Sequence, residues 1–343
     1  MSQIAYMSGE RILYWSGLIP ALGLAAGLCL ALALFPRYNR HNTAVWVFFP
    51  FALILGLFFS RVIYWYCHME QFPSFPEALL DWNTGSYALP GVILGVFLAA
   101  WIVRKLGLVQ HLGRLLDAVA PGLCLSFAFI RLGELFNTAC RSRITVKRPL
   151  FQRLPFAVKS VDSSGTVSWP LAVFFLSFLM LLVITVLLVH FYQRYRRYPM
   201  VDGSRVNGNV FRMFLLLWGV SEVLVDSLRY DSCLMHFTFL KSLNPYASFI
   251  SLGQVFAGVS ILCVLIHFTR VRFRGEGFNF KVLLAWLVFL LCLLGAGFFG
   301  EYRVQRTGNY LLCYSIQIVS LIVMALDIGW VYLGCEYREE DDY

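Results

Sequence analysis

The chain has 343 residues and a formal net charge of +9, yet only 14% of its residues are charged and 59% are hydrophobic. A soluble domain of this length could not keep so much apolar surface out of water, so the composition excludes a soluble globular protein. The mean hydropathy of +0.70 and apolar runs that recur to the C-terminus instead predict an all-α protein that crosses the membrane many times.

About nine segments are apolar enough, at about 20 residues each, to cross a bilayer as helices. In chain order they cover residues 12–35, 44–66, 87–103, 115–135, 169–191, 210–228, 247–269, 282–300 and 310–334. Basic residues cluster in the connections after the first, third, fifth and seventh spans, and the positive-inside rule places these connections in the cytoplasm. This orientation puts the N-terminus outside and the acidic tail "EYREEDDY" in the cytoplasm.

The segment at about 136–168, between the fourth and fifth spans, is long, basic and predicted to form a head on the outer face. Its basic residues, Arg143 among them, could meet anionic lipid headgroups or an acidic partner. A solvated basic loop is an equally good interpretation. The overall positive charge comes mainly from the cytoplasmic connections, so we predict no nucleic-acid partner.

We find no P-loop, no dinucleotide fingerprint and no metal-ligand spacing, and therefore predict no cofactor and no metal site. The glycine-rich stretch "GAGFFG", which ends at Gly300, lies at the end of an apolar span. We expect it to permit close packing of helices rather than phosphate binding.

The fourth span ends in "SFAFIRLGELFNTACRSR", where charged residues follow an apolar run. Arg131, Glu134 and Asn137 are spaced by three and would share one face near the outer end of a helix. A charged side chain at mid-bilayer costs roughly 2.5–3.5 kcal/mol, so such a residue indicates a function and a partner.

The sixth span carries a second polar stripe in "LLWGVSEVLVDSLRYDS", formed by Glu222, Asp226 and Arg229. In one interpretation, each stripe contains ion pairs that only satisfy each other within one helix or reach out to the interface. In the other, two helices that carry both signs of charge share a polar cavity, to which Arg61 of the second span adds a further guanidinium. We favour the shared cavity.

Such a cavity, lined by guanidinium groups and opening toward the outer leaflet, suits a ligand with an anionic phosphate and acyl chains. Arginine offers a planar and permanently charged fork of donors to phosphate oxygens. The residues alone therefore predict a phospholipid-headgroup site that is entered from the bilayer, with carboxylates that act as a base or orient the arginines.

Several segments resemble the prolipoprotein diacylglyceryl transferase family. "LYWSGLIPALGL" is similar to its first-helix "WYGL" region, "SRVIYW" to its "GGRIGY" element, and "LLDAVAPGLCLSFAFIRLGELFN" to its "DxxAPxxPxGxxxGRLGNFxN" signature. "LLLWGVSEVLVDSLR" and "ISLGQVFAGVSIL" resemble its last two helices. Family residues are kept at Arg61, Asp117, Pro121, Arg131, Leu132, Gly133, Asn137, Arg229, Gly253 and Gln254.

The resemblance, which covers about residues 10–272 in order, implies a seven-helix transferase-like domain at 1–272. Residues 273–343 then add two further helices and the acidic tail. It also implies a multi-pass enzyme of the bacterial inner membrane that moves diacylglycerol from phosphatidylglycerol to the cysteine of a prolipoprotein. The two partners that it implies are a phospholipid donor and a prolipoprotein acceptor.

For the site, the resemblance implies that arginines hold the lipid phosphate while the acceptor thiol attacks the glycerol carbon. The implied phospholipid ligands are Arg61, Arg131, Asn137, Arg143 and Arg229. The residues expected to take part in catalysis are Arg131, Glu134, Glu222 and Asp226.

The sequence departs from the family pattern at several functional positions. Family residues of other types are replaced by Ser16, Pro90, Glu134, Ala139, Trp169, Ala172 and Glu222. Because Pro90 stands where the family has a histidine, Glu134 or Glu222 would have to act as the base. These departures keep open the alternative of a catalytically silent relative that binds lipid or a membrane partner.

Overall fold

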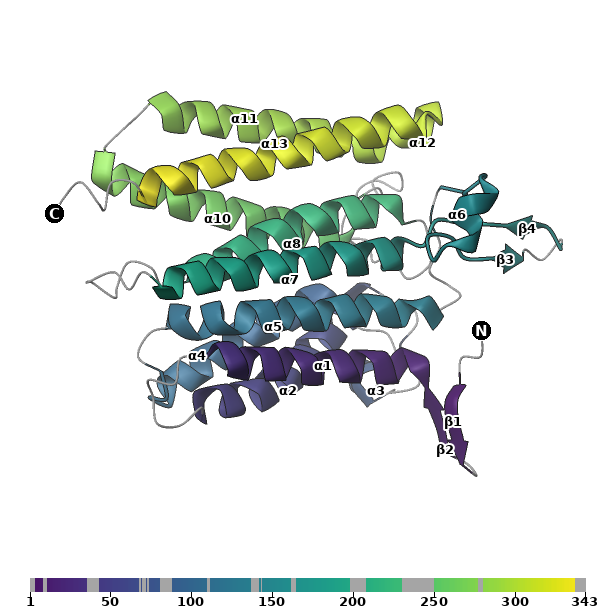
Figure 1. The fold of residues 1–343 in the computed structure, drawn as a ribbon, viewed down its shortest axis with the longest axis horizontal. Helices are drawn as coiled ribbons and strands as arrows, with labels where there is room; N and C mark the ends of the chain where they lie inside the picture. The colour runs from purple at the N-terminus through teal and green to yellow at the C-terminus, as the bar shows by residue number, and fades with distance from the viewer. Residues whose placement is uncertain are drawn as a thin grey trace.

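The computed structural model describes residues 4–8, 11–35, 43–67, 69, 72, 74–80, 88–109, 112–136, 142, 144–161, 165–197, 208–229, 250–276 and 280–336. Within these residues, nine long helices run side by side in one bundle (Figure 1). They are α1 (Trp15–Leu34), α2 (Thr43–Cys67), α4 (Leu89–Lys105), α5 (Leu112–Gly133), α7 (Val173–Arg197), α8 (Asn209–Leu228), α10 (Leu252–Glu276), α11 (Phe280–Gly297) and α13 (Tyr310–Glu336). Each coincides with one predicted span, so the prediction of an all-α, multi-pass membrane protein is confirmed.

Seven of the described helices are long and apolar enough to cross a membrane. The other two of the nine are α4, which has only 17 residues, and α8, which carries Arg212, Glu222 and Asp226. Large apolar side chains such as Leu311 and Leu294 cover the outer surface of the hairpin formed by α11 and α13. Nine crossings, with the N-terminus outside, stay a prediction.

The chain begins with a hairpin, in which β1 (Ile4–Ser8) pairs with the antiparallel β2 (Arg11–Tyr14). The first helix therefore starts at Trp15 rather than at residue 12, because residues 11–14 are extended and bonded to β1. The hairpin lies at the same end of the bundle as α6, β3 and β4 (Figure 1).

The predicted head contains α6 (Pro149–Arg153), β3 (Ser160–Val161) and β4 (Val167–Ser168). The prediction that the fifth span begins at residue 169 is wrong. Residues 169–171 pair with the head, where the Val146 amide donates to the Trp169 carbonyl at 2.7 Å and the Leu171 amide to the Ile144 carbonyl at 2.9 Å. Only after these bonds does α7 begin, at Val173.

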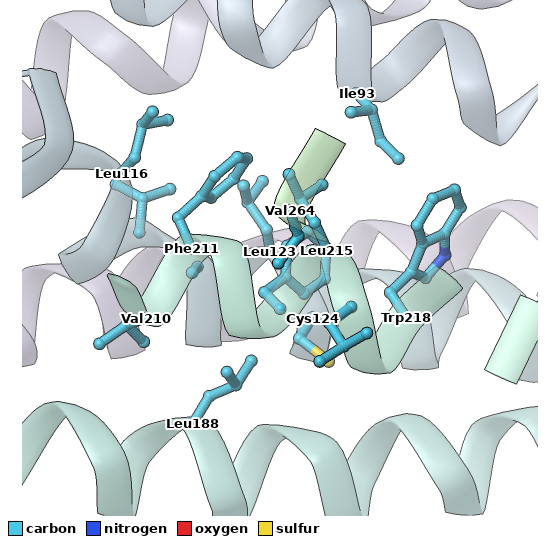
Figure 2. Packing of buried hydrophobic residues seen from close by; sticks show 14 of the residues in the cluster. Ile93, Leu116, Leu123, Cys124, Leu188, Val210, Phe211, Leu215, Trp218 and Val264 are labelled. Carbon is cyan, nitrogen blue, oxygen red and sulfur yellow. The ribbon is translucent and has the colours of Figure 1, made fainter. Parts of the chain in front are cut away.

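Helix α5 is largely buried and packs against α1, α7 and α8. Figure 2 shows side chains of α8, among them Phe211, Leu215 and Trp218, next to Leu123 and Cys124 of α5. The ring of Phe127 on α5 lies 6.0 Å from Phe214 and 6.5 Å from Trp218, measured between ring centroids. Helices α5 and α8, which carry the polar stripes, are therefore held together by apolar side chains that precede those stripes in each helix.

Helices α1 and α5 approach each other at a pair of glycines. A Cβ at Gly122 would lie 2.3 Å from the Gly27 carbonyl oxygen, and a Cβ at Gly27 would lie 2.4 Å from the Gly122 carbonyl oxygen. Small residues of this kind let two membrane helices bring their backbones into contact.

We expect Gly122→Ala to lower the free energy of unfolding by about 1–3 kcal/mol, because the added methyl group must push α1 away from α5. The measurement is thermal unfolding in detergent, followed by tryptophan fluorescence. Gly17→Ala is the matched control, since nothing lies within 4 Å of a Cβ at Gly17. We expect it to change stability by less than about 1 kcal/mol, and equal losses in both variants would contradict the packing role.

Asp117 of α5 caps the start of α8. Its Oδ2 accepts from the Gly208 amide at 2.7 Å and its Oδ1 from the Phe211 amide at 2.9 Å. Both amides belong to the first turn of α8, whose donors have no partner within the helix. This bond joins the helices at the end of the bundle opposite the head (Figure 1).

The C-terminal hairpin joins α11 to α13 through a π-helical segment, η3 (Phe298–Arg303), and the short α12 (Val304–Thr307). The prediction of close packing at "GAGFFG" is confirmed. A Cβ at Gly300 would lie 2.2 Å from Nε2 of Gln317, and a Cβ at Gly295 would lie 2.9 Å from Oγ of Ser320. The glycines thus admit polar side chains of α13 between the helices.

Candidate functional site

Helix α5 ends at Gly133, where the chain tightens into a 3₁₀ turn, η2 (Glu134–Phe136). The end of the helix lies against the start of α1, because a Cβ at Gly133 would lie 2.9 Å from Cγ of Pro20 and 3.3 Å from the Ser16 carbonyl oxygen. Arg131 therefore sits in the last turn of a buried helix, at the head end of the bundle (Figure 1).

The Arg131 guanidinium is held by two carboxylates from different parts of the chain. Its Nη1 donates to Oε1 of Glu134 at 2.9 Å, and its Nη2 donates to Oε1 of Glu222 on α8. The interpretation that Arg131 is satisfied within its own helix is therefore wrong, since the contact with Glu222 joins the two polar stripes. The structure brings three of the predicted site residues into direct contact, and their catalytic roles stay predictions.

The two carboxylates on Arg131 differ in burial. The side chain of Glu222 is 4% exposed, like that of Arg131, whereas the side chain of Glu134 is 24% exposed. Glu222 thus forms an ion pair inside the bundle, and Glu134 covers the guanidinium from the rim.

Asp226 lies one turn further along α8 and contacts the start of α10. Its Oδ2 accepts from the Ser251 hydroxyl at 2.6 Å. A Cβ at Gly253 would lie 2.2 Å from Oδ2 of Asp226 and 3.6 Å from Oε1 of Glu222. Both carboxylates of the α8 stripe therefore face the first turn of α10, and the missing side chain at Gly253 makes room for them.

Arg229 was expected on the same helical stripe, but α8 ends at Leu228 and Arg229 adopts an extended backbone conformation. Its Nη1 lies 3.9 Å from Oδ1 of Asp226. Arg229 also forms a β-bridge with Ser142, whose hydroxyl donates to the Leu228 carbonyl at 2.9 Å. The head segment is thereby fastened beside the ion pair.

Arg61 is buried and contacts α3 (Phe75–Leu80). Its Nε donates to the Ala78 carbonyl of α3 at 2.7 Å, and its guanidinium carbon lies 5.7 Å from the centroid of the Tyr64 ring. These contacts fasten α3 to α2.

Two of the predicted phospholipid ligands, Asn137 and Arg143, lie outside the described residues, as does Ala139. Ser16 is exposed in the first turn of α1, while Pro90 and Ala172 are buried. The side chains at these last three positions contain no titratable group, so the acids and bases of the described site are Glu134, Glu222 and Asp226 with their arginines.

Sequence reasoning missed a set of buried polar residues that gathers beside Asp226, mostly on its chain neighbour Ser227. They are Ser227 of α8, Ser251 before α10, Glu301 of η3, and Tyr314 and Gln317 of α13. One signal was available, because Gln317 and Glu301 stand within or directly after apolar runs. Their convergence depends on which helices are neighbours, and residue spacing does not reveal that.

The described cluster contains two guanidinium groups and three carboxylates, so the carboxylates outnumber the cations. Two nitrogen atoms of Arg131 are bound to carboxylates, and its buried Nε has no acceptor among the described atoms. Chemically, the cluster can exchange one carboxylate for another anion, hold that anion in a water-poor site, and leave the displaced carboxylate free to accept a proton.

Comparison with known proteins bears on this arrangement. Residues 3–270 match the family model described as prolipoprotein diacylglyceryl transferase. Proteins named phosphatidylglycerol–prolipoprotein diacylglyceryl transferase are among the relatives. That of Oceanobacillus iheyensis is 24% identical over 80% of this chain and 91% of its own length. A Clostridium perfringens protein of the same name, numbered 1, is 22% identical over 81% of this chain and 100% of its own length.

The match spans the helices that carry Arg131, Glu222 and Asp226, and it ends within α10, before the C-terminal hairpin. The order of the segments predicted from resemblance is therefore confirmed along most of the chain. This protein belongs to the prolipoprotein diacylglyceryl transferase family.

Proposed function

We propose that the protein transfers diacylglyceryl from phosphatidylglycerol to the cysteine thiol of a prolipoprotein at the outer face of the bacterial inner membrane. Family membership and the names of its relatives support this reaction. The observation that carries the proposal in the structure is the buried Arg131, held between Glu134 and Glu222 at the head end of the bundle. A permanently charged fork inside a membrane protein is suited to a lipid phosphate.

The lipid phosphate binds by replacing Glu134 on the Arg131 guanidinium. Glu134 is the more exposed of the two carboxylates, so its release costs less than the release of Glu222, which would be left as an uncompensated buried charge. Glu222 meanwhile keeps the guanidinium plane in place. Arg229, which is attached to the head through Ser142, lies beside the same region and adds positive charge.

Phosphate binding then supplies the base. The displaced Glu134 carboxylate accepts the proton of the acceptor thiol, and the thiolate attacks the glycerol carbon that bears the phosphate ester. The new carbon–sulfur bond forms as the carbon–oxygen bond breaks, and the electron pair leaves with glycerol phosphate. Arg131 stabilises the charge that builds on the leaving phosphate, which is the moment at which a preorganised cation contributes most.

The second candidate is a catalytically silent lipid-binding protein. The observation in its favour is that both terminal nitrogen atoms of Arg131 are already bound to carboxylates. One of these carboxylates belongs to Glu134, which replaces an asparagine of the family signature. Such a protein would bind a phospholipid without releasing glycerol phosphate.

One reconstitution separates the two candidates. The purified chain is placed in vesicles that contain phosphatidylglycerol, together with a peptide that carries a lipoprotein cysteine motif, and the peptide is analysed by mass spectrometry. We expect a mass increase equal to one diacylglyceryl group, with glycerol phosphate as the second product. Phosphatidylglycerol that stays bound to the protein while the peptide stays unmodified would establish the silent candidate. Vesicles of phosphatidylcholine are the control for the donor headgroup.

A further inference from the structure

The hairpin of α11, η3, α12 and α13 follows the part of the chain that matches the family, yet it places polar side chains inside the bundle. Glu301 is 6% exposed, Tyr314 is 5% exposed and Gln317 is fully buried. Polar groups are costly in such surroundings unless they are bonded. Their partners therefore reveal what the hairpin is doing.

All three side chains bind Ser227 of α8. Nε2 of Gln317 donates to Oγ of Ser227 at 2.6 Å, and the Ser227 hydroxyl in turn lies 2.6 Å from Oε1 of Glu301. The Tyr314 hydroxyl donates to the Ser227 carbonyl at 2.9 Å. Ser227 follows Asp226 directly, so the hairpin holds the backbone of α8 at the site itself.

Glu301 also binds the capping box of α10. In this box the backbone amide of Gln254 donates to Oγ of Ser251 at 3.0 Å, and the backbone amide of Ser251 donates to Oε1 of Gln254 at 2.9 Å. Nε2 of Gln254 then donates to Oε1 of Glu301 at 2.6 Å.

These bonds decide where the hydroxyl hydrogen of Ser251 goes. Because Oγ of Ser251 accepts from Gln254, its own hydrogen is free to go to Oδ2 of Asp226 at 2.6 Å. A continuous path of hydrogen bonds therefore runs from Glu301 through Gln254 and Ser251 to Asp226. The donors at the two ends of the path, the Ser251 hydroxyl and the Gln254 side-chain amide, each donate to a carboxylate, that of Asp226 and that of Glu301.

We propose that Glu301, together with Gln317, is a positioning residue for Asp226, and that the C-terminal hairpin completes the catalytic site. This inference rests on the proposed transferase function. The Asp226 carboxylate accepts from the Ser251 hydroxyl and lies against Gly253, and the next residue in the chain, Ser227, is bonded to the hairpin. Without the hairpin, Ser227 loses its bonds to Tyr314 and Gln317, and both Ser227 and Gln254 lose Glu301.

A purely structural hairpin would not need this chemistry, because apolar side chains of similar volume pack between membrane helices without any desolvation cost. Both bonds that Glu301 accepts from Gln254 and Ser227 end on the same oxygen, Oε1. A glutamine amide offers one such oxygen in the same place, and a leucine offers none.

The test compares Glu301→Gln, Glu301→Leu and Val304→Ala in the full-length chain. Val304 is 1% exposed in the apolar cluster that joins the hairpin to α7 and α8, so its truncation loosens this packing but removes none of the hydrogen bonds on the path to Asp226. We expect Glu301→Leu to lower kcat for transfer about tenfold while KM for phosphatidylglycerol changes less than about twofold. Glu301→Gln and Val304→Ala should keep kcat within about twofold of the unmodified chain.

A second readout needs no activity. Hydrogen–deuterium exchange of peptides that cover residues 250–258 reports on the amides of Ser251 and Gln254 in the capping box. We expect Glu301→Leu to speed exchange there about tenfold and Val304→Ala to leave it unchanged. Equal effects of both variants on kcat or on exchange at 250–258 would overturn the proposal. An unmodified chain without transfer activity would instead reject the proposed function, while exchange would still decide whether the hairpin holds the site.

Discussion

Replacement of Arg131 by alanine is expected to abolish diacylglyceryl transfer, with product below about 1% of that formed by the unmodified chain. Two carboxylates, those of Glu134 and Glu222, hold the Arg131 guanidinium in place at the head end of the bundle. In the proposed reaction its positive charge stabilises first the bound phosphate and then the leaving group. Arg131→Lys keeps the charge but loses the planar fork, so we expect it to recover only a small part of the rate. The measurement is peptide modification by mass spectrometry in phosphatidylglycerol vesicles.

Arg272→Ala is the matched control for this prediction. Arg272 is another buried arginine, 8% exposed, with its guanidinium carbon 5.2 Å from the centroid of the Trp330 ring. It lies near the far end of α10, about 30 Å along the helix from Ser251 by the rise of 1.5 Å per residue. The control should lose stability but keep its transfer rate per folded molecule, and full activity of Arg131→Ala would refute the assigned role.

Replacement of Glu222 by alanine is expected to have the largest effect on stability, a loss of about 3–5 kcal/mol in the free energy of unfolding. Removal of Glu222 takes away the buried partner of Arg131 and leaves its charge in the interior of the bundle. The double variant Arg131→Met with Glu222→Leu should recover most of the melting temperature in detergent, because it removes both charges together, yet remain inactive.

Glu134→Ala is the comparison that makes this result specific. Glu134 binds the same guanidinium but is partly exposed, so its loss should cost no more than about 1 kcal/mol. Its effect should appear in turnover, since the proposed base is gone. Similar melting temperatures for Glu222→Ala and Glu134→Ala would show that the two ion pairs do not differ in the way their burial indicates.

Much of the fold was predictable because nine apolar runs, separated by charged connections, are strong signals for helices in a bilayer. Their ends were less predictable. Trp169 and Leu171 are apolar and extend the fifth run toward the head, yet they bond to the head backbone instead of joining α7. Hydropathy measures whether a residue can enter the membrane, and backbone partners decide whether it belongs to the helix.

The site was predictable where charges repeat along one helix. The spacing of Arg131 and Glu134, and of Glu222 and Asp226, indicated two polar faces, and the structure joins them through the ion pair of Arg131 with Glu222. The contact of Arg61 with α3 was not predictable, because its Nε donates to the carbonyl of Ala78, a group that every residue possesses. The contacts of Glu301 were not predictable either, because they form only when η3 and α13 pack against α8.

The cap that Asp117 places on α8 has a consequence for biosynthesis. Its acceptor oxygens and the Gly208 amide are separated by 91 positions in the chain. At about 5–20 residues per second, the ribosome makes the cap roughly 5–20 seconds before the helix that needs it. The acceptor for the first amides of α8, which carries Arg212, Glu222 and Asp226, is therefore already made when α8 enters the membrane. The half of the protein that is made first thus contains the cap for a helix of the half that is made second.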